Sequence, residues 1–184
     1  MARTAVKPQL QLVPAPEAPR PAFSALETVY RDHARFVAVL ALHVLGRDLE
    51  VDDVVQDVFL SAASGLARLR EPAALRAWLG TITVRLARRR LRARRLLALF
   101  GLDPQPDYGE LVATDASPEQ RLLVSQVYLI LDSVPAKDRV AWTLRYVEGA
   151  RLEEVARLCE CSLATAKRRI VAAQQRLETE LADE

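Results

Sequence analysis

The chain has 184 residues, of which 51% are apolar and 5% aromatic, and its formal net charge at pH 7 is +2. This length allows one ordinary domain or two small ones, and scarce aromatic residues beside abundant Ala, Leu and Arg favour helices over sheets. No apolar run approaches the ~20 residues of a membrane span, and no secretory signal pattern begins the chain, so we expect a cytoplasmic protein without membrane insertion.

The two cysteines, Cys159 and Cys161, are two positions apart. Such a pair cannot form an ordinary disulfide framework, and no second Cys or His cluster completes a zinc site. His33 and His43 are far from both cysteines in sequence. We therefore expect no metal site and no cofactor, and interpret the cysteines as small buried side chains in a reducing compartment.

The N-terminal residues 1–22 hold five prolines and no helical period, which predicts a disordered tail. The first helix is expected to begin at Ser24, because Ser24 and Glu27 form a capping-box pattern, and to end at Gly46. Between them, apolar residues recur at near-helical spacing: Leu26, Tyr30, Val37, Leu40 and Val44.

A second helix is expected from Leu49 to Leu66. Its apolar residues fall at i, i+3, i+4, i+7 and i+8 and make one stripe: Val51, Val54, Val55, Val58 and Phe59. On the remaining faces, Asp53 and Asp57 lie one turn apart with Gln56 beside them. No nucleophile, metal ligand or phosphate-binding loop accompanies these carboxylates, so catalysis is not expected.

A third helix follows a short loop that carries Arg68 and Arg70, and Pro72 suits its first turn. Its expected buried stripe is Leu75, Trp78, Leu79, Ile82 and Leu86. Seven arginines then occur between positions 85 and 95 with no acid among them, and four of them form a stripe: Arg85, Arg88, Arg92 and Arg95, widened by Arg89. A solvated face would mix in acids, so the run favours contact with nucleic acid. Asp53 and Asp57 should then face a basic protein partner on another side.

Residues 98–116 are predicted to be a linker, because they contain glycines, prolines and several acids. They divide the chain into expected domains at 23–97 and 117–184. The second domain is expected to contain four helices: Ser117–Asp132, with an N-cap, a proline and Gln120; Pro135–Val147, ending near Gly149; Leu152–Cys159; and Ser162–Leu181. No strand is expected, so the predicted fold class is all-α.

The last two helices match a helix-turn-helix, in which the second helix enters the major groove. Its apolar side would be Ala166, Ile170 and Ala173. Arg168 then points outward as the main base reader, while Lys167 and Arg169 hold phosphates. The alternative is an ordinary helical hairpin with a solvated basic face. Glu160 stands at the turn where a glycine is usual, at a cost of about 1 kcal/mol.

Four segments carry a resemblance to the sigma factors of bacterial RNA polymerase. The segment Asp52–Leu60 resembles the polymerase-binding part of region 2, and Val29–Ala34 resembles the start of that region. The segment from Leu144 to Ala156 resembles region 4, and Ser162–Arg169 looks like its recognition helix. The two blocks follow one another with no further domain between them, so the chain resembles the compact extracytoplasmic-function group of the sigma-70 family.

This resemblance implies a transcription factor that is not an enzyme. It implies docking on the clamp helices of the largest subunit of core RNA polymerase through Asp53, Gln56 and Asp57. Contact with the −10 promoter element is implied for Arg68, Arg70, Arg85, Arg88, Arg89 and Arg92. Contact with the −35 element is implied for Ser162, Thr165, Lys167, Arg168, Arg169 and Val171. An anti-sigma factor is the further partner that the resemblance implies.

The third helix departs from that family's usual pattern. Val84 and Arg85 stand where the family carries an Arg-Asn pair, and Arg89 stands where it carries an Asp. Two alternatives therefore stay open: a helix-turn-helix regulator that binds operators without polymerase, and a sigma-like adaptor that binds polymerase but no longer opens promoters.

Overall fold

The computed structural model describes residues 21–66, 69, 71–102, 108, 111 and 116–182, of which 21–24 and Pro72 by backbone only. Its helices are α1 (Pro21–Leu45), α2 (Val51–Gly65), α3 (Leu75–Leu99), α4 (Pro118–Ser133), α5 (Ala136–Tyr146), α6 (Leu152–Leu158) and α7 (Leu163–Ala182), with short 3-10 turns η1 (Asp48–Glu50) and η3 (Pro72–Ala74). Within these residues there is no strand, in agreement with the all-α prediction. None of the described helices is long and apolar enough to span a membrane.

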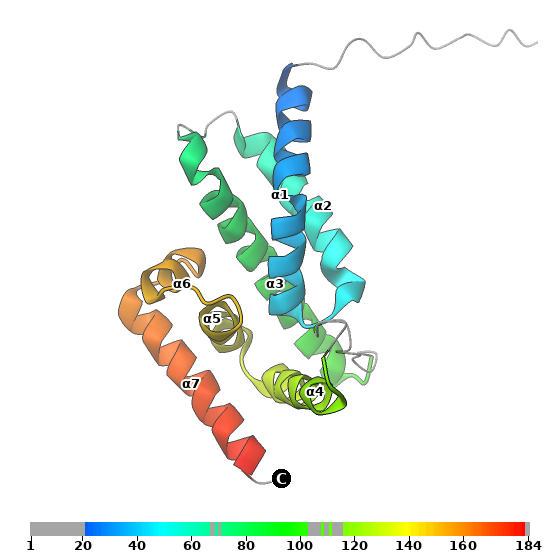
Figure 1. Ribbon diagram of the computed structural model, residues 1–184, viewed down its shortest axis with the longest axis vertical. Coiled ribbons are helices and arrows are strands. Elements are labelled where there is room, and N and C mark those ends of the chain that lie inside the picture. The colour runs from blue at the N-terminus through cyan, green and yellow to red at the C-terminus, as the bar shows by residue number, and fades with distance from the viewer. Residues whose placement is uncertain are drawn as a thin grey trace, which may run out of the picture.

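Helices α1, α2 and α3 pack side by side as one bundle (Figure 1). Most residues of the predicted stripes pack in its interior, and Val37, Val54 and Val58 are fully buried there. The predicted start of α1 is wrong: the helix begins at Pro21, so Ser24 lies inside it and is not its N-cap. Proline is tolerated in a first turn because its missing N–H would have no helical partner there. The remainder of the predicted tail lies outside the described residues.

Gly46 ends α1 as predicted, with a φ of +71°. A Cβ at this position would lie 2.5 Å from a ring carbon of Tyr128 in α4, so the site excludes a side chain as well as favouring a left-handed residue. The next two helix starts are later than predicted. Short 3-10 turns precede both, so α2 starts at Val51 and Pro72 opens η3 while α3 starts at Leu75.

The second block follows the prediction closely. Ser117 and Gln120 form a complete capping box at the start of α4. The turn before α7 places Glu160 at a φ of +50°, so the strained position expected from the sequence is present. Helix α3 continues to Leu99 and thus takes in the first two residues of the predicted linker, most of which lies outside the described residues.

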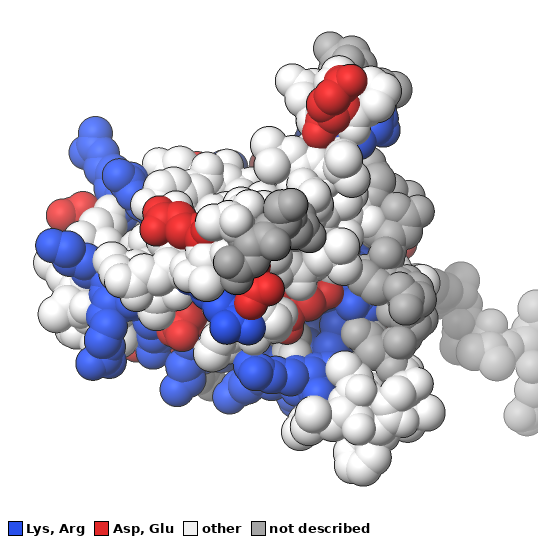
Figure 2. All heavy atoms as spheres, turned by 90° about the horizontal axis from the view of Figure 1, so that it is seen from below, with Lys and Arg blue, Asp and Glu red and all other residues white. Residues whose placement is uncertain are grey.

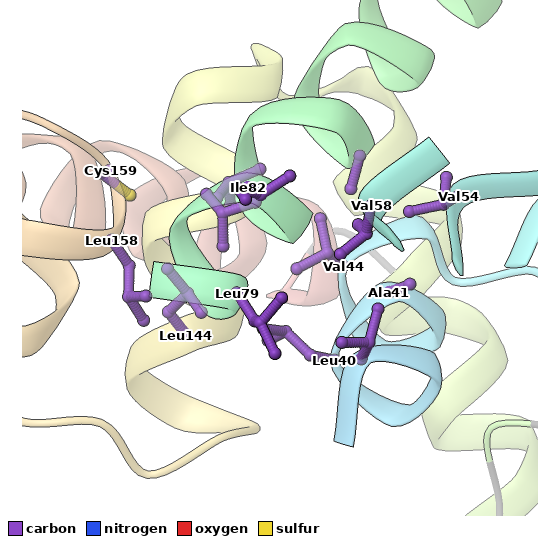
Figure 3. Packing of buried hydrophobic residues seen from close by; sticks show 14 of the residues in the cluster. Leu40, Ala41, Val44, Val54, Val58, Leu79, Ile82, Leu144, Leu158 and Cys159 are labelled. Carbon is purple, nitrogen blue, oxygen red and sulfur yellow. The ribbon is translucent and has the colours of Figure 1, made fainter. Parts of the chain in front are cut away.

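The two blocks share one apolar core, which the sequence did not predict. Leu79 and Ile82 of α3 belong to the same buried cluster as Leu144 of α5 and Leu158 of α6 (Figure 3). A Cβ added at Gly80 would lie 3.0 Å from a methyl carbon of Leu158, so α3 and α6 meet closely. A smaller cluster, centred on Tyr128, Leu131, Ala173 and Leu177, joins α4 to α7.

A buried arginine of the second block forms hydrogen bonds to the end of α1. Arg139 of α5 donates from Nε to the carbonyl of Val44 (3.2 Å) and from Nη2 to that of Leu45 (2.8 Å). Its Nη1 donates to Asp132. These carbonyls are among the last of α1, where helices leave acceptors unsatisfied and favour positive charge. We call Arg139, Asp132 and these two carbonyls the buried joint.

The protonation states of the groups at and beside the buried joint agree with the hydrogen bonds that these groups form. Burial opposes ionisation of Asp132, but the Arg139 guanidinium and hydrogen bonds from Tyr108 and Arg139 leave the pKa of Asp132 below its ordinary value. Burial raises the pKa of Tyr128 to about 12, so its hydroxyl stays protonated and donates to the carbonyl of His43 (2.8 Å). The joint is therefore an ion pair with its hydrogen-bonding partners in place.

Candidate functional site

Helix α2 presents the three polar residues singled out in the sequence on one outer face. Asp53 and Gln56 are exposed and Asp57 is half-buried. Positions i, i+3 and i+4 of a helix are neighbours, so the three side chains form a continuous surface, called here the acidic edge. The inner face of α2 is fixed in the bundle by Val54 and Val58, and this orients the acidic edge outward.

An apolar hollow lies beside the acidic edge, between α1 and α2. Its volume is about 510 Å³, and its lining residues are Leu26, Tyr30, Asp52, Val55, Gln56, Phe59 and Leu60. Leu60 is 65% exposed, and Tyr30 packs edge-on against Phe59 with ring centroids 4.7 Å apart. An apolar hollow rimmed by charged groups is the usual composition of a protein-binding surface.

This hollow was not predicted from the sequence. Tyr30, one of the apolar residues that recur at near-helical spacing, is 49% exposed, and Leu60 was named only as the last residue of the segment that resembles the polymerase-binding part of region 2. The available signal was the position of Leu60, an apolar residue on the otherwise polar side of α2.

The acidic edge is joined to the arginine run by one side chain. Arg90 of α3 lies 3.5 Å (Nη1) from an Asp53 carboxylate oxygen and 3.2 Å (Nη2) from an Asp57 carboxylate oxygen. From the sequence, these acids were expected on a different side from the arginines. Because α2 and α3 pack together, the two surfaces meet at Arg90.

The arginines of α3 differ in their exposure to solvent and in their partners. Arg85, Arg89, Arg92 and Arg95 are exposed. Arg88 is half-buried, and its Nε is buried without a hydrogen bond within the described part of the chain. Arg94 is buried and donates to Glu50 (2.8 Å) and to the Leu45 carbonyl (2.9 Å), so it belongs to the protein interior. Arg68 and Arg70 lie outside the described residues.

Helix α7 has the geometry predicted for a recognition helix. Its inward residues Ala166, Ile170 and Ala173 are buried. Ser162 caps it: the Thr165 amide donates to the Ser162 hydroxyl (3.2 Å), and that hydroxyl donates to the Thr165 hydroxyl (2.9 Å). This fixed cap orients the first turns of the helix.

The outward residues of α7 are Lys167, Arg168 and Val171, all exposed. Arg169 is half-buried, and its Nη1 is buried without a hydrogen bond in the described residues. Burial raises the pKa of Asp138 in α5, and Arg169 and Arg168 act against that rise, so both arginines lie within electrostatic reach of α5. The two arginines differ in exposure: Arg168 is exposed to solvent, whereas Arg169 is half-buried with one buried nitrogen.

Basic side chains gather along one edge of the molecule. Figure 2 shows Lys and Arg along the lower edge of the molecule seen from below, with most of the visible Asp and Glu lying above them. Such a segregation of charge favours a polyanion at that edge and a cationic partner elsewhere.

The two cysteines, both expected to be buried, differ in exposure. Cys159 is buried, Cys161 is half-buried, and both are free thiols. Burial raises the pKa of the Cys159 thiol to about 11, so it is protonated and unreactive near neutral pH. Among the described residues, no group of three or more His, Cys, Asp or Glu side chains could hold a metal ion.

Comparisons with known proteins match both blocks. The family model for sigma-70 region 2 matches residues 29–96, and that for sigma-70 region 4 matches residues 125–177. A probable RNA polymerase sigma factor RfaY of Xanthomonas campestris is 34% identical over 79% of this chain and 37% of its own length. The extracytoplasmic-function sigma factor SigE of Mycolicibacterium smegmatis is 29% identical over 88% of this chain and 63% of its own. The chain thus spans less than two thirds of these two relatives.

Other relatives are matched over more of their length. The extracytoplasmic-function sigma-E factor of Haemophilus influenzae is 27% identical over 87% of both chains. Among solved structures, the sigma factor RpoE in complex with the anti-sigma factor NepR from Bartonella quintana superposes with a TM-score of 0.63, at 21% identity, over 86% of this chain and 98% of that one. CnrH in complex with the cytosolic domain of CnrY superposes with a TM-score of 0.58 at 22% identity, over 88% of this chain and 90% of that one.

Proposed function

From the premise that the chain belongs to the sigma-70 family and is of the extracytoplasmic-function type, we propose that it binds core RNA polymerase and directs it to specific promoters. Sigma factors are transcription initiation factors rather than enzymes, and we assign this chain no catalytic step. It acts in the cytoplasm by positioning the polymerase on promoter DNA. The observation that carries the proposal is the pairing of a protein-binding surface on α2 with a basic, outward-facing recognition helix α7 in one chain.

Residues 23–97 are assigned to polymerase docking and to the −10 element. The acidic edge offers carboxylates to cations on the clamp helices of the largest subunit, and the adjoining hollow accepts an apolar side chain. The exposed arginines Arg85, Arg89 and Arg92 face promoter DNA. Arg88, with a buried unpaired donor, contributes after a shift of its side chain.

Residues 117–184 are assigned to the −35 element. Arg168 and Val171 read base edges in the major groove, because both lie on the exposed ridge of α7. Lys167 holds phosphate, and Ser162 and Thr165 stabilise the start of the helix that approaches the backbone. Arg169, which is half-buried, reaches phosphate only at the margin of this surface.

Promoter opening is the step at which we expect this chain to differ from the usual pattern of its family. Val84 is buried, so it is part of the interior and has no access to DNA. Arg85 and Arg89 supply positive charge in place of an amide and an acid. We propose that the unpaired −10 bases are held more by contacts to their phosphates than by contacts to the bases themselves. Unstacking these bases costs a few kcal/mol, and contacts with polymerase help to offset that cost.

The test of the proposal is reconstitution. The purified chain mixed with core polymerase should yield transcripts that start at particular promoters selected from the genome of its source organism, and permanganate should detect unpaired thymines in the −10 region. Polymerase binding without a permanganate signal would support the adaptor alternative. Tight operator binding by the free chain, with no binding to core polymerase, would support the regulator alternative.

Changing Arg168 to alanine should relax base preference at one position of the −35 element by about 1–3 kcal/mol, because a single side chain reads that base. The measurement is the affinity of holoenzyme for a set of promoters with each −35 base varied in turn. Lys167→Ala is the matched control on the same exposed turn, and should weaken binding to every sequence by a similar factor and reduce its salt dependence. Uniform weakening by Arg168→Ala would reassign Arg168 to phosphate contact.

An anti-sigma factor is the further partner that we propose. The support is the structural neighbour from Bartonella quintana, which is a sigma factor in complex with the anti-sigma factor NepR. The exposed apolar residues at the end of α3, Leu96, Leu97, Leu99, Phe100 and Leu102, provide surface for such a protein.

A further inference from the structure

Arg90 is the one described arginine of the α3 run whose side chain pairs with the acidic edge. It comes from a different helix, 33 positions from Asp57 along the chain, and one guanidinium nitrogen faces each carboxylate. Its neighbours Arg89 and Arg92 are exposed. The pairing is thus a specific consequence of how α3 lies against α2.

The position of Arg90 bears on what a partner of the acidic edge would meet. The carboxylates of Asp53 and Asp57 are the groups that a cation on a docking protein would approach. In the free chain, each of them already has a cation at 3.5 Å or less. The side chains of Arg90, Asp53 and Asp57 are 34%, 65% and 46% exposed, so the pairs are solvated at their outer side. Ion pairs of this kind are held weakly enough to be exchanged for others.

We propose that Arg90 is an internal competitor for the acidic edge: it occupies Asp53 and Asp57 in the free chain and is displaced when a cationic side chain of RNA polymerase binds them. This inference rests on the proposed docking of core polymerase at that edge. When Arg90 is displaced, its guanidinium becomes solvated and its ion pairs with Asp53 and Asp57 are lost. The free energy of these two ion pairs therefore reduces the free energy gained on docking. Arg90 therefore sets the affinity for polymerase below what the carboxylates alone would provide.

The test is Arg90→Gln, a change that removes the charge and leaves a shorter polar side chain with the same first three carbons. Binding of the full chain to core polymerase should tighten two- to five-fold, which corresponds to about 0.4–1 kcal/mol. The gain should shrink as salt is raised, because the competing pairs are screened by ions. Affinity can be measured by fluorescence anisotropy of labelled chain titrated with polymerase, and a thermal melt of each variant checks that it is folded.

Arg176→Gln is the matched control. Arg176 of α7 also forms an exposed ion pair, with Glu180 at 2.8 Å, and its removal changes the net charge equally. It should leave polymerase affinity unchanged. An equal gain in both variants would show a general effect of net charge and would overturn the competitor role of Arg90, as would unchanged or weaker binding by Arg90→Gln.

A second pair of variants separates this inference from the function on which it rests. Asp53→Asn combined with Asp57→Asn should weaken polymerase binding, and in that background Arg90→Gln should have no further effect. If the two asparagines leave the affinity unchanged, docking at the acidic edge is refuted and the competitor with it. If they weaken binding while Arg90→Gln gives no gain in the native background, only the competitor is refuted.

Discussion

Replacing Arg139 by alanine should lower the free energy of unfolding by about 3–5 kcal/mol, the range measured when one partner of a buried ion pair is removed. Arg139 is among the most completely buried side chains of the described chain, at 1% exposure. Its loss leaves Asp132 without its main counter-charge and the carbonyls of Val44 and Leu45 without two of their donors. Urea unfolding followed by circular dichroism measures the change.

Lys137→Ala is the control, since Lys137 is exposed on the same helix and should cost under about 0.5 kcal/mol. Combining Arg139→Ala with Asp132→Ala gives a double-mutant cycle. The coupled pair should make the double variant more stable than the sum of the two single losses predicts. A loss below about 1 kcal/mol for Arg139→Ala would mean that water replaces the guanidinium at little cost and that the joint does not hold the blocks together.

Features that depend on local sequence could be predicted. The stripe of α2, the capping box at Ser117, the end of α1 at Gly46 and the left-handed Glu160 all follow from spacing or backbone preference within a few residues. The same holds for the inward and outward faces of α7. The misplaced start of α1 shows the limit of such reasoning, because a capping-box pattern inside a continuing helix looks the same in sequence as one at its end.

Features that depend on contacts between distant segments could not be predicted. Arg85, Arg90 and Arg94 are alike in the sequence, yet one is exposed, one pairs with the acidic edge and one is buried at the end of α1. Arg139 carries no sign of burial in its own helix. The hollow beside Leu60 exists only because α1 and α2 lie at a certain separation. These differences arise from how the helices pack against one another, and a single sequence does not show that packing.

Reversing the charge of both acids, by Asp53→Lys with Asp57→Lys, should weaken binding to core polymerase at least thirty-fold, or about 2 kcal/mol. The two lysines would repel the cations proposed to dock there, and they would also repel Arg90, which loses both of the acids that it pairs with. Both positions are exposed or half-buried, so the fold should be retained. Titration of labelled chain with polymerase measures the affinity, and circular dichroism checks the helices.

Glu178→Lys with Glu180→Lys changes the net charge by the same amount on α7 and is the control. It should leave polymerase affinity unchanged, because α7 makes no part of the acidic edge or of the hollow beside it. Similar losses in both double variants would indicate that bulk charge, not this surface, governs association. Unchanged affinity after reversal at Asp53 and Asp57 would instead remove polymerase docking from α2 and leave the basic helices α3 and α7 as the functional surfaces, which is what the operator-binding alternative requires.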